Sequence, residues 1–327
     1  MAMNLTRRRF TLSAAAAIAS ARLLAQQAGA KRSVATMDHD NILAEAAAAL
    51  KSQPVGLLDV SASVAALTAA FILTQQESYA LAAFGQLTDW LPKPISQTPH
   101  PPSVVELIPA AEIARSISFL TAAVHTDPIN AWLVDLQQWL NTAHDPVIAR
   151  DTKDHRASAW LLLMSAIARS QRDDATLDAC RKRFKRPTLR NQINEKGQFP
   201  QEMASTNPFC DTLFNFDLLC GACQLLDSTL DPLWSFELID GVSLRDVAAW
   251  LFPILQDPRK WPGVSDAEHF RELPGRRPGL LFAGRAYDRA EYVELWRTTA
   301  PAVPRDIAAS FPIRQPLLWT TRAPHGY

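Results

Sequence analysis

Apolar residues recur along most of the chain at the three-to-four-residue spacing of helices, and polar or proline-rich stretches separate them. Residues 42–50 (ILAEAAAAL) form a strongly helical stretch, and 55–90 predicts two long helices with a break near 75–78. The stretch 91–102 is rich in proline and predicts an irregular loop. The remaining predicted helices cover 104–124, 129–142, 157–170, 175–184, 208–226, 242–255 and 279–296, with polar or irregular connections at 144–154, 191–207 and 256–278.

This pattern and the composition together predict an all-α fold. Ala and Leu dominate, only 11 glycines are present, and no Asn-Gly pair marks a hairpin. About eight to ten helices in antiparallel pairs, joined in places by long polar loops, predict an incomplete α/α toroid. An array of helical repeats is the alternative. A P-x-R-x-P pattern occurs at 274–278 and again at 312–316, each time before apolar residues and an aromatic one, which predicts a repeated loop-to-helix device.

The first 30 residues are typical of an export signal. Arg7, Arg8 and Phe10 fit a twin-arginine pattern, a short apolar run follows, and the segment ends in small residues at 28–30. An ordinary basic amphipathic N-terminus is the alternative. We therefore expect a signal peptide of the twin-arginine type over 1–30, a mobile leader over 31–40, a single domain over 41–327, and a periplasmic or secreted mature protein.

Charge and cysteine spacing exclude some functions. The formal net charge is zero, and without residues 1–30 it is −4, so the chain lacks the basic excess of nucleic-acid-binding proteins. The apolar run within 1–30 is far shorter than the roughly 20 residues of a membrane span, and we expect no stable membrane insertion. Cys220 and Cys223 have the spacing of a redox pair. They also continue the apolar stripe of Phe209, Leu213 and Phe216, which predicts buried core thiols instead.

Two predicted helix starts carry a concentration of polar residues. Asp154 and His155 stand just before one helix, and Asn207 stands just before a later one, on which Asp211 and Asn215 lie one turn apart. A helix start presents unpaired N–H groups and a partial positive charge, so the two starts together predict a site for an anionic ligand. An equally good interpretation makes Asp154 and Asn207 ordinary helix caps and His155 a half-buried connector.

Most of this polar chemistry lies in two segments, 153–160 (KDHRASAW) and 191–217 (NQINEKGQFPQEMASTNPFCDTLFNFD). The second contains a Gln-Ile-x-x-x-Gly-x-x-Pro-x-Glu loop followed by a Leu-Phe-Asn-x-Asp helix. In their order and spacing, the two segments resemble the alginate-lyase-like family of uronate polysaccharide lyases, which is related to family 5. The resemblance covers roughly residues 95–319.

This resemblance implies an incomplete α/α toroid and an exported enzyme. The enzyme would cleave a 1,4-linked uronate polysaccharide, alginate-like or glucuronan-like, by β-elimination and without a metal or organic cofactor. Relatives use Asn, His and Arg near the substrate carboxylate and a Tyr as acid or base. The chain departs from them with Asp154 in place of the Asn, Ser205 in the region of the Arg, and Asp211 at the position of the Tyr. Asp154 would repel a uronate carboxylate unless it pairs with Arg156 or Lys153.

The expected ligand is therefore an anionic polysaccharide or oligosaccharide, and alternative functions are a non-catalytic relative that binds it and a helical scaffold protein. His155 is the expected base or carboxylate contact, and Asn207 the expected neutraliser of that carboxylate. Three tryptophans, Trp160, Trp261 and Trp319, could stack on sugar rings, but they and Tyr287 are more typical of core packing. The predicted catalytic residues are His155, Asn207 and Asp211. The predicted substrate-binding residues are Asp154, Arg156, Trp160, Asn215, His269, Arg271 and Arg314.

Overall fold

The computed structural model of the protein describes residues 32–121, 123–263, 270–301 and 303–323. Within these ranges no strand is present, and one antiparallel bridge joins Glu237 to Ser243. The all-α prediction is confirmed. The helices are α2 (Val34–Met37), α3 (His39–Ala49), α4 (Gly56–Thr74), α5 (Glu77–Trp90), α6 (Ala110–Leu120), α7 (Asp127–Thr142), α8 (His144–Arg150), α9 (His155–Gln171), α10 (Asp174–Arg183), α11 (Arg190–Gln192), α12 (Pro200–Met203), α13 (Pro208–Leu226), α14 (Leu244–Gln256), α15 (Pro278–Ala286), α16 (Ala290–Thr298) and α17 (Pro316–Thr320). Short 3-10 or π turns occur at η1 (Ile95–Gln97), η2 (Phe184–Leu189), η3 (Leu233–Ser235), η4 (Pro258–Lys260) and η5 (Arg305–Ser310).

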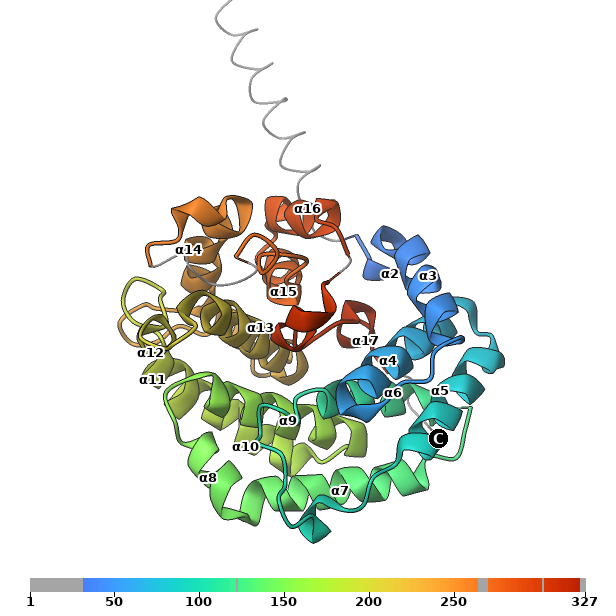
Figure 1. Ribbon diagram of the computed structural model, residues 1–327. Coiled ribbons are helices and arrows are strands. Elements are labelled where there is room, and N and C mark those ends of the chain that lie inside the picture. Colours follow the sequence, from blue (N-terminus) through green and yellow to red (C-terminus); the bar gives the residue numbers. More distant parts are fainter. Residues whose placement is uncertain (1–31, 122, 264–269, 302, 324–327) are drawn as a thin grey trace, which may run out of the picture.

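The long helices form an incomplete ring, the α/α toroid that the sequence predicts (Figure 1). Helices α4, α6, α9, α13 and α15 pack on one another in chain order, and α17 contacts α4, α6 and α13. The helices that alternate with them in the chain, α5, α7, α10, α14 and α16, pack against the members of this inner set.

Hydrophobic patterning explains which helices are inner ones. Every residue from 157 to 168 in α9 and from 212 to 223 in α13 is buried, so these helices are covered on all sides. In α7 the buried residues recur at helical spacing on one face, as expected of a helix with solvent on its other side. The predicted stripe on α13 is confirmed, because Phe209, Leu213, Phe216, Cys220 and Cys223 are fully buried.

The four cysteines are free thiols in this structure. Burial raises the pKa of the Cys220 and Cys223 thiols well above its usual value, which disfavours the reactive thiolate. The prediction of core thiols is therefore confirmed over that of a redox pair.

Some element boundaries differ from the predicted ones. The expected leader over 31–40 is helical from Val34 onward, where Val34 is buried and Asp38 is held by an ion pair. The expected connection at 144–154 contains α8. The expected helix over 279–296 is two helices, with a break at Asp288, whose φ of 53° lies in the left-handed region. The predicted signal over 1–30 lies outside the described residues.

Two helices, α4 and α13, are long and apolar enough to cross a membrane by length and composition alone. Within the ring, 56% and 83% of their most apolar windows are buried against the rest of the protein. Both belong to the inner set, and the core helices of a large protein share this all-round apolar composition with membrane spans.

Buried ion pairs connect helices that are far apart in sequence. Asp217 of α13 and Arg277, the residue before α15, lie 2.7 Å apart and are both completely buried. The N–H of Gly279 donates to Asp217 Oδ1 at 2.9 Å, and a Cβ at this glycine would approach the same oxygen to 2.8 Å. Asp38 and Arg276 form a second pair at 2.8 Å, which joins the first helices of the ring to the loop before α15.

Candidate active site

The site begins at the start of α9. Asp154 is the N-cap of this helix, with an extended backbone, and its carboxylate accepts the backbone N–H of Arg156 at 3.0 Å. The same carboxylate forms an ion pair with the Arg156 guanidinium at 2.6 Å. Burial alone would raise the pKa of Asp154, but hydrogen bonds from Arg156 and Thr152 bring it below its usual value. The negative charge of Asp154, which would repel a uronate if it were unpaired, is therefore paired with Arg156.

Glu202 on the short helix α12 holds His155, the first residue of α9. Its Oε1 accepts the backbone N–H of His155 at 2.5 Å, and its Oε2 lies 3.0 Å from Nδ1 of the His155 ring. Glu202 is only 1% exposed, so this carboxylate is a buried acceptor aimed at one histidine. Since an ionised carboxylate can only accept, Nδ1 carries the proton and Nε2 is the nitrogen left for other chemistry.

A buried amide network fixes Glu202 in turn. Asn215 of α13 donates through Nδ2 to Glu202 Oε1 and to Gln192 Oε1, both at 2.9 Å. Gln192 also accepts from the Ser158 hydroxyl at 3.0 Å and donates to the carbonyl of Asp154 at 3.1 Å. The network therefore ties the starts of α9 and α12 to the middle of α13. Asn215 is completely buried, so the prediction that it binds substrate is wrong, and its amide supports Glu202 instead.

Asp211, in the first turn of α13, lies beside this pair. His155, Glu202 and Asp211 each offer a ligand atom, and these atoms lie within 4.8 Å of one another. The Ser205 hydroxyl donates to Asp211 Oδ2 at 2.7 Å and fixes the carboxylate. The His155 ring packs edge-on against Phe214, with ring centroids 5.8 Å apart. One histidine and two carboxylates at this spacing are also a donor set that can hold a divalent cation.

The charges around His155 favour its protonated form. Burial lowers the pKa of the imidazole, but the hydrogen bond and charge of Glu202, together with the charges of Asp211 and Asp154, outweigh it and raise the pKa above its usual value. Among the residues that the structure describes, no Lys or Arg pairs with Glu202 or Asp211. The imidazolium is therefore the cation nearest to the two carboxylates.

Comparison with known proteins now adds the family. The sequence profile of the family described as alginate lyase matches residues 17–261, three quarters of the chain. The chain belongs to the alginate lyase family. The crystal structure of an alginate lyase from Bacteroides ovatus has a similar fold, with a TM-score of 0.65 and 19% sequence identity over 80% of this chain and 73% of that one. No curated protein sequence matches the chain. Membership of the alginate lyase family supports the assignment of this protein as a polysaccharide lyase.

Three other predicted residues of this alginate lyase family member lie in α9 or at the start of α13. Arg156 is half-exposed beside the site through its pair with Asp154. Asn207 is exposed at the N-cap position of α13, but its side chain makes no capping hydrogen bond, so the predicted side-chain cap is wrong. Trp160 is 6% exposed and its indole N–H donates to the carbonyl of Leu140 at 2.9 Å, so the core interpretation is confirmed and the assignment of Trp160 to substrate binding is wrong.

The remaining predicted residues lie in the C-terminal third of the chain. Arg271 is exposed, and its neighbour Phe270 packs on Phe209 at the start of α13, with ring centroids 4.6 Å apart. Arg314 lies apart from His155, at the start of α6 and α17, where its backbone N–H donates to Glu112 Oε1 at 2.9 Å. His269 lies outside the described residues. Trp261, Trp319 and Tyr287 pack in the core, as predicted; burial raises the pKa of the Tyr287 hydroxyl and its oxygen has no hydrogen-bond partner among the described residues.

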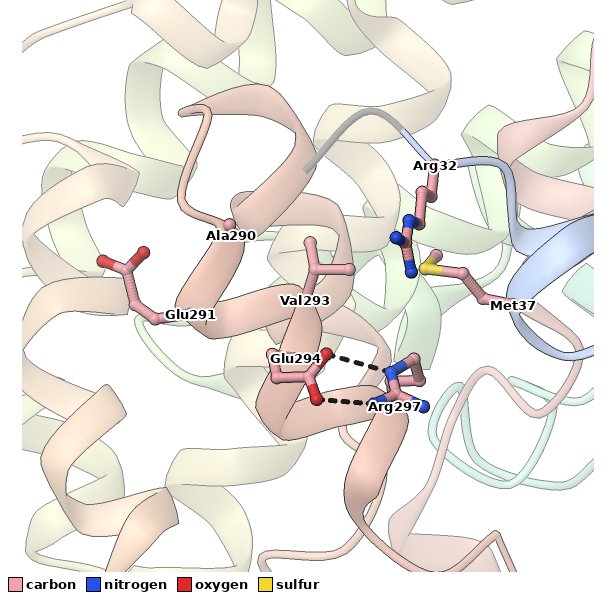
Figure 2. Close-up of a pocket in the computed structure, with 7 residues that line it drawn as sticks. All are labelled: Arg32, Met37, Ala290, Glu291, Val293, Glu294 and Arg297. Carbon is pink, nitrogen blue, oxygen red and sulfur yellow. Dashed lines mark hydrogen bonds and ion pairs between the residues drawn. The ribbon is translucent and has the colours of Figure 1, made fainter. Parts of the chain in front are cut away.

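The sequence motifs contained Glu202, Gln192 and Ser205, but sequence reasoning gave none of them a role. The signal for Glu202 was present, because the chain brings a glutamate to the end of the same loop whose family resemblance was noted. The pocket in Figure 2, by contrast, contains none of the predicted site residues. It lies between Arg32, Met37 and α16, and an ion pair between Glu294 and Arg297 at 2.6 Å forms part of its wall.

Proposed function

We propose that this protein is an exported polysaccharide lyase that cleaves 1,4-linked uronic acid polysaccharides by β-elimination. The observation that carries the proposal is the cluster of His155, Glu202 and Asp211 at the adjoining starts of α9 and α13, in a member of the alginate lyase family. Export rests on the sequence of residues 1–30, with its paired arginines and short apolar run.

The reaction sets three requirements. The proton on C5 of a uronate is beside a carboxylate, so the negative charge of that carboxylate must be neutralised before an enolate-like state can form. A base must remove the proton, and an acid must protonate the oxygen of the leaving sugar. A site for this chemistry therefore needs a cation, a base and a proton donor within a few ångströms.

The cluster offers these groups. Glu202 favours the protonated form of His155, which in this proposal neutralises the uronate carboxylate, and the exposed amide of Asn207 at the start of α13 adds a neutral donor. Asp211, fixed by the Ser205 hydroxyl, accepts the C5 proton in this proposal, at the position where the family resemblance implies a tyrosine. In this proposal Asp211, once protonated, then gives its proton to the leaving oxygen.

A second function is favoured by the same substitution. Asp211 and Ser205 stand where relatives have Tyr and Arg, and a chain that lost both groups can retain the carbohydrate site without the chemistry. A non-catalytic relative of this kind binds polyuronates and releases no product.

Mixing the purified mature protein with alginate, glucuronan and other polyuronates, and following absorbance of the unsaturated product, separates the two functions. We expect turnover that His155→Ala removes and that His144→Ala, a change of an exposed histidine on α8, leaves intact. Slow migration in gels that contain an undegraded polyuronate, without any product, would support the binding relative. Silence in both assays would refute a role in polyuronate chemistry.

Export has its own test. Cells that express the full chain are fractionated, and the protein is followed in the periplasm, the medium and the cytoplasm. We expect exported protein, and we expect the double change of Arg7 and Arg8 to Lys to retain it inside the cell. Cytoplasmic wild-type protein would refute export and leave the lyase proposal unaffected.

A further inference from the structure

A second site is suggested by a cavity of about 840 Å³ where the first helices of the ring meet the last ones. One wall is formed by α3 and the start of α4, and the other by Arg276, Trp296 and the segment 303–316. Its volume lies within the range of small-molecule sites, and it shares no residue with the His155 cluster.

The repeated P-x-R-x-P motif builds this cavity. In each copy the last proline is the first residue of a helix, α15 in one case and α17 in the other. The arginine two residues earlier, Arg276 or Arg314, lines the cavity in both copies. The residue between them is buried, and it ties the loop to a neighbouring helix: Arg277 to Asp217, and Gln315 to Glu45 at 2.8 Å. The motif thus turns two arginines from different parts of the chain toward one space.

The arginines differ in how far their donors are already used. Arg276 is fully engaged, because it pairs with Asp38, donates to the carbonyl of Trp296 at 3.2 Å and lies 3.8 Å above the Trp296 ring. Arg314 has a buried Nη2 without a hydrogen-bond partner among the described residues. A buried donor without a partner costs free energy that an incoming carboxylate oxygen would recover.

Other groups at the cavity suit a sugar acid. Arg305, the first residue of η5, is exposed there and adds a second cation. Asp59 and Asn41 offer acceptors and a donor for hydroxyl groups. Burial, opposed by the hydrogen bond from Asn41, raises the pKa of Glu45 to about 7, so this carboxyl group repels an anion less than an ordinary glutamate does.

One side-chain contact lies between the segments that carry the cavity and the His155 cluster. The Cys210 thiol contacts the Ser310 hydroxyl at 3.2 Å. Cys210 precedes Asp211 in the chain, and Ser310 precedes Phe311, which lines the cavity. This contact therefore joins the segment that carries Asp211 to the segment that lines the cavity.

We propose that this cavity is a remote subsite, in which Arg314 and Arg305 bind the carboxylate of a uronate unit distant from the bond that is broken. The inference rests on the proposed function and names a further part of its substrate site. It predicts that long oligouronates are better substrates than short ones and that the difference depends on these arginines.

The test compares short and long oligouronates of defined length with wild-type protein, Arg314→Ala and Arg305→Ala. Loss of a charge-assisted contact is expected to raise KM for the long substrate about tenfold or more, with kcat and the constants for the short substrate unchanged. Arg297→Ala is the matched control, because that arginine lies in the separate pocket of Figure 2. Arg305 is exposed, so its variant keeps the test open if Arg314→Ala fails to fold.

The outcomes separate this inference from the lyase proposal. If the wild type cleaves polyuronates and both arginine variants keep the wild-type KM for long substrates, the subsite is refuted and the lyase stands. If no polyuronate is cleaved but calorimetry shows that a long oligouronate binds the wild type and binds Arg314→Ala at least tenfold more weakly, the subsite stands and the lyase falls. Absence of both turnover and binding overturns both.

Discussion

Changing Glu202 to Gln removes one charge from the site and keeps nearly the same shape. Gln retains an oxygen that can accept the backbone N–H of His155 and the amide of Asn215, which Oε1 of Glu202 now accepts at 2.5 and 2.9 Å. Its other group is an NH₂ donor, so Nδ1 of His155 must become the acceptor. Only the neutral imidazole can accept there, and the substitution therefore drives the proton off the ring.

The magnitude follows from the contact that is lost. A hydrogen bond between charged partners contributes about 1.5–3 kcal/mol, which corresponds to about one to two pKa units. Burial, which lowers the pKa of His155, is then no longer opposed by the hydrogen bond and charge of Glu202. We expect the pKa of His155 to fall from above its usual value to below it. If the imidazolium neutralises the substrate carboxylate, activity at neutral pH should drop about tenfold to a hundredfold.

Two measurements check this prediction. The dependence of kcat/KM on pH should show activity that is lost as pH rises through the pKa of His155, with the loss displaced to lower pH in Glu202→Gln. Titration of the His155 ring signals by NMR should show the same displacement without any substrate. Glu77→Gln, on the exposed start of α5, is the control and should change neither curve. Superimposable profiles for Glu202→Gln and the wild type would refute the role of Glu202.

Three further changes test other parts of the structure. Arg277→Met leaves Asp217 buried without its partner and should cost about 3–5 kcal/mol in urea unfolding, most of which a compensating Asp217→Leu should restore; full stability of the single variant would contradict the role of the pair. Because burial raises the pKa of Glu45 to about 7, its contribution to stability is present below its unfolded pKa and lost as pH rises through 7. Glu45→Gln should therefore be more stable than the wild type at pH 8, by about 2–3 kcal/mol in the free energy of unfolding measured with urea. A variant whose stability depends on pH as that of the wild type does would contradict this role of Glu45. Chelation by EDTA should leave turnover intact, because Glu202 and His155 Nδ1 already satisfy each other; loss of activity restored by a divalent cation would instead assign the cluster as a metal site.

The fold was largely predictable because its main signals are local. The helical spacing of the apolar residues predicted α7, α9 and α13, but only the structure shows that α9 and α13 are covered on all sides while α7 keeps one exposed face. Some helix boundaries could not be predicted from the sequence. The division at Asp288 and the helix at 34–37 depend on tertiary contacts, such as the pair between Asp38 and Arg276, whose partners are far apart in the chain.

The candidate site likewise contains residues that the sequence identified and residues whose role depends on tertiary contacts. His155 and Asp211 were identified from their places at helix starts and from family resemblance, and the structure brings them together. Trp160 had the residue type of a sugar site although core packing was the favoured interpretation, and only the structure shows that Asn215 is buried as well. Glu202 was overlooked because nothing local marks a glutamate as buried. Its role depends on a histidine 47 positions earlier in the chain.

The electrostatic balance of the site explains how the chain can carry Asp154 and Asp211 where the family resemblance implies Asn and Tyr. Three carboxylates, those of Asp154, Glu202 and Asp211, surround one histidine, an arrangement that would exclude an anionic substrate if all three were unpaired. Arg156 offsets the first, and the His155 imidazolium offsets the second. Asp211 forms no ion pair with a Lys or Arg among the described residues and lies beside the same imidazolium, and it is the group that the proposed reaction needs as a base. The carboxylate of Asp211 is thus available for the proposed proton transfer, while those of Asp154 and Glu202 hold the site in place.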